Sequence, residues 1–142
     1  MFRVSPASLV AAALIAASPA AAGNGQPTAL GTWINPYGSV AVRTGACDGK
    51  LCGWVVWANP VAKQDARDAG VPNLIGVELL ESYHQQHNAK WAGTVYVPDL
   101  GHRFSSTITS IGPNALKVQG CLIGGFLCKS QLWKRIEHLP NG

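Results

Sequence analysis

The stretch GCLIGGFLCKSQLWKR, residues 120–135, holds a turn and the strand that ends the domain. If Gly124 and Gly125 are the central residues of a two-residue hairpin turn, Cys121 faces Cys128 across the hairpin. Directly opposed strand positions lie close enough for a disulfide. The stretch therefore predicts a disulfide-closed hairpin, whose second strand runs on to the end of the domain.

The tip of this hairpin is apolar, although turn tips are usually polar because they lie in water. It carries four large hydrophobic side chains: Leu122, Ile123, Phe126 and Leu127. We therefore expect the tip to contact something. A ligand mouth, a dimer contact and a membrane-facing lip are the three interpretations, in that order.

Upstream, short runs of β-branched and aromatic residues alternate with clusters of Gly, Pro, Asn and Asp. These runs predict eight strands, over 29–35, 39–45, 51–57, 75–82, 91–97, 102–111, 115–123 and 126–136. The polar stretch 58–73 is predicted as a loop, with a helical turn over 61–69 as the alternative, and 83–90 as a second loop. Mostly tight connections favour an all-β, antiparallel, up-and-down barrel over a Greek key.

The two ends of this strand series carry a matching pair of motifs. Gly31 and Trp33 open the first strand, and Arg135 ends the last. A closed barrel pairs its first strand with its last, since closure removes the exposed edges. We expect Trp33 to cap one end of the barrel, with Arg135 stacked on its indole by a cation–π contact. A G-x-W motif beside a late arginine resembles the signature of lipocalins and related calycin barrels.

A wider resemblance covers about residues 30–136. Four motifs carry it: C-G-x-[IV]-V-W at 52–57, W-x-G-x-[IV]-Y-x-P at 91–98, L-x-V-x-G-C at 116–121 and Q-x-W-x-R at 131–135. With these motifs the chain resembles the domain-of-unknown-function family 2147, which consists of small exported bacterial proteins. The resemblance implies a lipocalin-like barrel in the periplasm or outside the cell, and it implies no established activity.

The first 22 residues have the pattern of a secretory signal peptide. Arg3 precedes a short apolar run, and an A-x-A sequence of small residues ends at Ala22. The apolar run is too short to span a membrane. We expect cleavage after Ala22, which leaves a single β-barrel domain over 23–142 with its core at about 30–136, located in the periplasm or secreted.

Export changes the interpretation of the four cysteines, because exported proteins retain disulfides. The spacings favour two local bridges, Cys47–Cys52 and Cys121–Cys128. A zinc site is the alternative, but the chain has no close C-x-x-C pair. A two-residue turn at 48–49 would pair Cys47 with Lys50, so we expect a four-residue loop at the first bridge.

Charge and motifs argue against several classes of function. The net charge of +4 comes from scattered basic residues rather than a nucleic-acid footprint. His84 and His87 form an H-x-x-H pair, but a polar loop needs no metal, and on a strand the two side chains point to opposite faces. No phosphate loop, dinucleotide fingerprint or strained nucleophile turn appears. We therefore expect no metal, no cofactor, no nucleic-acid partner and no enzymatic activity.

The bulky residues on the central strands are the candidates for a ligand pocket: Trp54, Val56, Trp57, Tyr96, Phe104 and Ile108. The interior of an eight-stranded barrel is either filled by side chains or holds one small ligand. The leading hypothesis is a barrel that binds a small hydrophobic ligand or lipid in the cell envelope. The alternative is a protein-interaction or inhibitor module that acts through the apolar tip, on another protein or in a homodimer.

Overall fold

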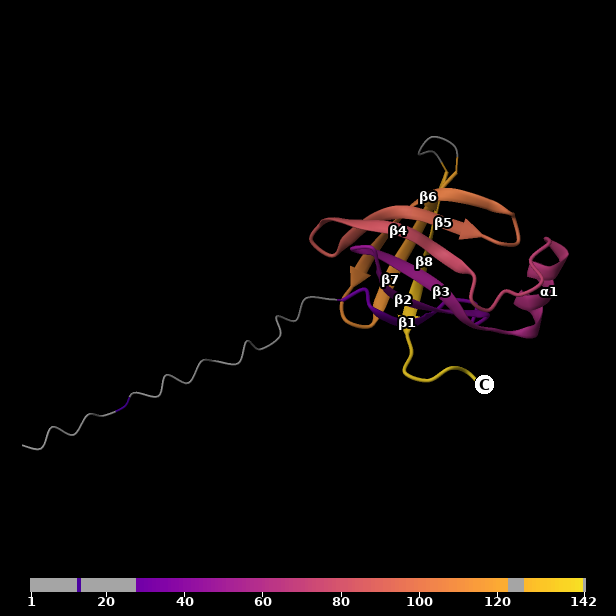
Figure 1. The fold of residues 1–142 in the computed structure, drawn as a ribbon, viewed down its shortest axis with the longest axis horizontal. Helices are drawn as coiled ribbons and strands as arrows, with labels where there is room; N and C mark the ends of the chain where they lie inside the picture. The colour runs from indigo at the N-terminus through magenta and orange to yellow at the C-terminus, as the bar shows by residue number, and fades with distance from the viewer. Residues whose placement is uncertain (1–12, 14–27, 123–126, 142) are drawn as a thin grey trace, which may run out of the picture.

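The computed structural model describes residues 13, 28–122 and 127–141 of the chain. In this part, eight strands form a closed barrel in which neighbours in the chain pair antiparallel and β1 pairs with β8 (Figure 1). The strands are β1 (Gly31–Ile34), β2 (Val40–Cys47), β3 (Lys50–Ala58), β4 (Glu78–His87), β5 (Lys90–Val97), β6 (His102–Ile111), β7 (Ala115–Cys121) and β8 (Cys128–Arg135). The predicted up-and-down barrel is confirmed, while the expected signal peptide lies, apart from Ala13, outside the described residues.

The antiparallel order places alternate connections at opposite ends of the barrel. We call the end that carries 35–39, 59–77, 98–101 and the β7–β8 connection the open end. The closed end carries the start of β1 and the connections 48–49, 88–89 and 112–114. The two described residues of the apolar tip, Leu122 and Leu127, thus lie at the open end, and the G-x-W motif lies at the closed end.

Trp33 and Arg135 pack against each other at the closed end. They are register partners between β1 and β8, and the guanidinium carbon of Arg135 lies 4.2 Å from the centre of the fully buried Trp33 ring. The guanidinium also donates hydrogen bonds to the backbone oxygens of Pro113, Leu30 and Thr28, at 2.8, 2.8 and 3.1 Å. The expected stacking is present, and the arginine additionally holds the segment before β1 in place.

The core fills the barrel between its two ends. The largest fully buried side chains come from six strands and from both halves of the chain: Trp33, Val42, Val55, Leu80, Tyr83, Ile108 and Leu116. On β6, burial alternates as period-2 geometry requires, since Ser106, Ile108 and Ser110 are buried and their neighbours are not. The part of the barrel interior nearer the closed end is therefore filled by side chains rather than hollow.

The β4–β5 hairpin is longer than we expected. Residues 83–90 were predicted as a loop, but β4 runs to His87 and β5 begins at Lys90. Beyond Tyr83 the β4 side chains are exposed on both faces. A strand that is wet on both faces has no apolar alternation, so its polar sequence looks like a loop.

A helix replaces most of the predicted loop over 58–73. This helix, α1, spans Pro60–Asp68, and the Asn59 side chain caps it by accepting a hydrogen bond from the Ala62 amide at 2.8 Å. Proline at the first helical position, directly after an asparagine cap, is a recognised helix start. Ala66 is buried against the core cluster, so α1 covers part of the open end.

Both disulfides form, but the first hairpin has a different turn from the one we expected. Asp48 and Gly49 have positive φ angles of 49° and 74°, as a two-residue type I′ turn requires. Cys47 therefore pairs in register with Lys50, and the bridge runs diagonally to Cys52 over a Cα–Cα distance of 5.9 Å. A four-residue loop is not needed, because diagonal neighbours on one face of a hairpin are within reach of each other.

Candidate functional site

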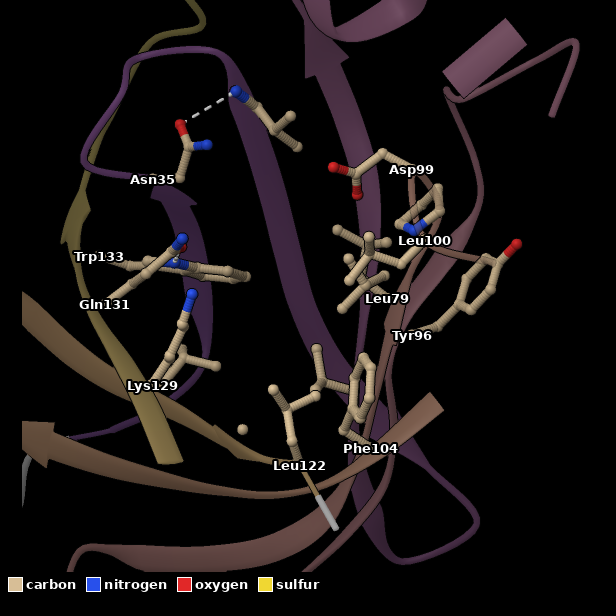
Figure 2. Close-up of a pocket in the computed structure, with 16 residues that line it drawn as sticks. Asn35, Leu79, Tyr96, Asp99, Leu100, Phe104, Leu122, Lys129, Gln131 and Trp133 are labelled. Atoms are coloured by element: carbon tan, nitrogen blue, oxygen red, sulfur yellow. Dashed lines mark hydrogen bonds between the residues drawn. The ribbon is translucent and has the colours of Figure 1, made fainter. Parts of the chain in front are cut away.

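A cavity of about 360 Å³ opens at the open end of the barrel (Figure 2). Its walls come from β5, β6, β7 and β8, from the starts of β2 and β4, and from the connections at Asn35, 98–100 and Leu122. β3 contributes no lining residue. The cavity is thus built mainly from the second half of the chain, above the packed core.

The lining is mostly apolar, and it faces inward by strand alternation. Its main hydrophobic side chains are Leu79, Val95, Phe104, Val118, Leu122 and Trp133. On β8, the cavity residues Lys129, Gln131 and Trp133 occupy every second position, while Leu132 between them is exposed. One face of the closing strand therefore forms one wall of the cavity.

Four polar side chains line the cavity, and they differ in how far they are already used: Asn35, Asp99, Lys129 and Gln131. The Asn35 oxygen accepts from the amides of Ser39 and Val40, and its nitrogen donates to the Ser39 hydroxyl at 2.8 Å. Its hydrogen-bonding groups therefore hold the β1–β2 turn. Within the described residues, the ion pair found is Arg103–Glu81, on the outside of the barrel, and it involves neither Lys129 nor Asp99.

Two of the six predicted pocket residues belong to this lining, Phe104 and Tyr96. Phe104 projects into the cavity, whereas the Tyr96 ring turns away from it (Figure 2). The guanidinium carbon of Arg103 lies 4.6 Å from the centre of that ring. Tyr96 therefore borders the cavity while its aromatic face is used on the outer surface.

The other four candidates do not line the cavity: Trp54, Val56, Trp57 and Ile108. A Cβ on Gly53 would collide with Leu80 and Val42 in the core, so the adjacent Trp54 faces outward, where it packs over Gly45. Near the open end, the backbone of β3 pairs with the α1–β4 connection, since the Val55 amide donates to the Val77 oxygen at 2.9 Å. Ile108 faces inward but lies in the packed core below the cavity.

The predicted apolar tip is described only at its two edges. Leu122 lines the cavity, and Leu127 is 71% exposed. Ile123 and Phe126 lie outside the described residues. The register of the hairpin is the predicted one, with Cys121 opposite Cys128 and joined to it over a Cα–Cα distance of 4.0 Å.

No metal cluster lies in the described part of the chain, where no three His, Cys, Asp or Glu side chains could share an ion. His84 and His87 are exposed on β4. Over the same residues, the structure contains no helix with the length and apolar character that a membrane crossing needs.

Three buried hydroxyls inside the barrel have no hydrogen-bond partner of normal geometry among the described residues: those of Tyr83, Ser106 and Ser110. Burial raises the pKa of the Tyr83 phenol well above its ordinary value, the neighbouring Ser106 hydroxyl opposes this, and the Glu81 charge adds to it. Tyr83 therefore stays neutral and acts as a core residue rather than as an acid or base.

Known proteins resemble the chain at the level of family and fold. Residues 31–135 match the family described as an uncharacterized protein conserved in bacteria, DUF2147. The chain belongs to this family. Among solved structures, this DUF2147 protein is similar to protein HP1028 from the human pathogen Helicobacter pylori, which belongs to the lipocalin family. The TM-score is 0.59 at 15% identity, over 78% of this chain and 84% of that one, which shows a shared fold. No curated protein matches the sequence.

Our sequence reasoning missed the polar part of the cavity wall. Lys129 and Gln131 were not among the candidates, although the sequence carried a signal for both. Once Trp133 is placed inside the barrel, every second residue back along β8 shares its face. The contributions of Leu79 and of 98–100 carried no comparable signal, because they depend on how the connections fold over the open end.

Proposed function

We propose that this DUF2147 protein is an exported, non-enzymatic carrier or sensor that holds a small hydrophobic ligand or lipid of the cell envelope in its open-end cavity. The cavity carries the proposal. A volume of about 360 Å³ with mainly apolar walls and few polar groups is typical of small-molecule sites, which span roughly 300–1,000 Å³.

Export is supported by the two disulfides, since such bonds persist mainly in oxidising compartments. The absence of enzymatic activity is a proposal that rests on the cavity's chemistry. Among the lining residues, no nucleophile lies beside a base, and the titratable side chains are an aspartate, a lysine and a tyrosine whose ring faces outward.

The test is binding of 1-naphthylamine, a small, neutral apolar dye whose fluorescence depends on the polarity of its surroundings and whose size suits the cavity. We expect one dye molecule per barrel, displaced by 1-decanol. Gly120→Leu should abolish binding, since a side chain at this position grows into the cavity beside Val95, whose Cγ1 would lie 3.4 Å from the new Cβ. Lys117→Leu, on the outer face of the same strand, is the control and should bind normally.

Dye binding that survives Gly120→Leu would place the apolar site elsewhere. The alternative of an interaction module is favoured by one observation, the exposure of Leu127 at the tip. That alternative predicts dye binding, if any, that responds to Leu127→Asp and not to Gly120→Leu.

A further inference from the structure

The polar groups that the β8 wall of the cavity offers to a ligand are hydrogen-bond donors. Lys129 and Gln131 are successive residues on the cavity face of this strand, and both line the cavity. An ammonium group can only donate hydrogen bonds. The remaining question is which end of the Gln131 amide is available to a ligand.

Trp133 answers this question. Its indole Nε1–H donates to the Gln131 oxygen at 2.8 Å. An indole nitrogen can only donate, so it fixes the amide with its oxygen toward Trp133. The Gln131 NH₂ group therefore stays available as a donor. Together with Lys129, it gives the wall two donor groups and a positive charge, while the Gln131 oxygen already accepts a hydrogen bond from the indole.

A carboxylate or a similar anion matches such a wall, because charge-assisted hydrogen bonds are the strong ones. The only opposing charge in the lining is that of Asp99, on the β5–β6 connection across the opening from Lys129 (Figure 2). It forms no ion pair with Lys129. Asp99 thus leaves Lys129 available, and it disfavours an anion on its own side of the opening.

The remaining lining residues indicate the chemical character and size of the rest of the ligand. The walls around Leu79, Val95 and Phe104 are apolar and suit a hydrocarbon chain. At about 30 Å³ per water-sized group, the cavity of about 360 Å³ takes roughly a dozen non-hydrogen atoms. A linear chain of about ten carbons with a carboxylate head has this size.

We propose, resting on the proposed function, that the ligand is a single-chain amphiphile with an anionic head, held by Lys129 and Gln131 while its chain lies in the cavity. Lys129 then determines specificity, and Gln131 is oriented by Trp133. Asp99 acts in the opposite sense, by weakening the binding of an anion.

The test is calorimetric titration with decanoate, 1-decanol and decyltrimethylammonium at pH 7.5 and low ionic strength, below their micelle-forming concentrations. We expect decanoate to bind about five- to tenfold more tightly than decanol, and the cation to bind most weakly. Lys129→Met keeps the apolar stem of the lysine, and it should remove the preference for decanoate while decanol binding is unchanged. Asp99→Asn should strengthen decanoate binding about twofold.

Lys117→Met is the matched control, since it removes one positive charge from the outer face of the neighbouring strand. Equal binding of decanoate and decanol would overturn the proposal of an anionic head group, while the proposal of a hydrophobic ligand in the cavity would still hold. An equal loss of decanoate binding in Lys117→Met would also overturn it, by assigning the effect to net charge. If neither ligand binds, the proposed function fails as well.

Discussion

Gly31 leaves the space into which the Arg135 guanidinium fits. A Cβ at this position would lie 2.1 Å from the Arg135 Nη1, and the φ angle of 152° is one that side chains rarely adopt. We expect Gly31→Ala to lower the free energy of unfolding by about 2–3 kcal/mol in urea denaturation. Gly112→Ala is the control: its φ of 64° is also unfavourable, but its surroundings are open, so about 1 kcal/mol is expected. Equal losses would mean that the contact with Arg135 is unimportant.

Tyr83 should make the protein sensitive to alkaline pH. Burial raises its folded-state pKa, so the unfolded chain loses the phenol proton above about pH 10 while the folded barrel keeps it. The unfolded state then binds fewer protons, and stability falls as pH rises, by up to about 1.4 kcal/mol per pH unit from this group. Below pH 10 the group contributes no pH dependence. Urea denaturation at pH 9, 10 and 11 measures the slope.

Tyr83→Phe separates this effect from general alkaline unfolding. Its hydroxyl has no partner of normal geometry, so its removal should be nearly neutral at pH 7 and should flatten the slope above pH 10. Tyr37→Phe changes a side chain that is 78% exposed, and it should leave the slope as it is. If Tyr83→Phe kept the wild-type slope of stability against pH, the alkaline loss of stability could not come from the Tyr83 phenol.

The two disulfides close hairpins at opposite ends of the barrel, which makes them a matched pair. Replacing either pair of cysteines by serines should cost about 2–3 kcal/mol, since both loops are short and of similar length. Only the Cys121–Cys128 bridge lies beside cavity residues, namely Leu122 and Lys129. We expect its loss to weaken decanol binding severalfold, while loss of Cys47–Cys52 lowers stability alone. Binding isotherms and urea denaturation of the two double variants check this, and equal effects on binding would refute it.

The sequence was informative where an element has one wet face and one buried face. The register of β7 and β8 followed from the Gly-Gly turn and the cysteine spacing, and it agrees with the structure. The predicted end of β4 was wrong because the residues beyond Tyr83 are exposed on both faces of the strand. The extent of α1 was uncertain because its buried residue Ala66 is small, although Asn59 and Pro60 marked its start.

At the scale of the whole barrel, the closed topology was predictable and the location of the cavity was not. Closure followed from the pairing of Trp33 with Arg135. The cavity lacks β3 because Trp54 lies on the outer face of the barrel and Val55 is buried in the packed core. Both facts depend on contacts between distant segments, to which local sequence patterns are insensitive.

Because β8 both closes the barrel against β1 and forms a cavity wall, a ligand in the cavity should stabilise the whole fold. A ligand that binds only the folded state raises the free energy of unfolding by about 2.7 kcal/mol at a hundredfold excess over Kd. For a domain of this size, we expect Tm to rise by roughly 8–15 °C with 1-decanol in a thermal melt. Lys117→Leu should keep this shift and Gly120→Leu should lose it. A full shift in Gly120→Leu would show that decanol binds outside the cavity.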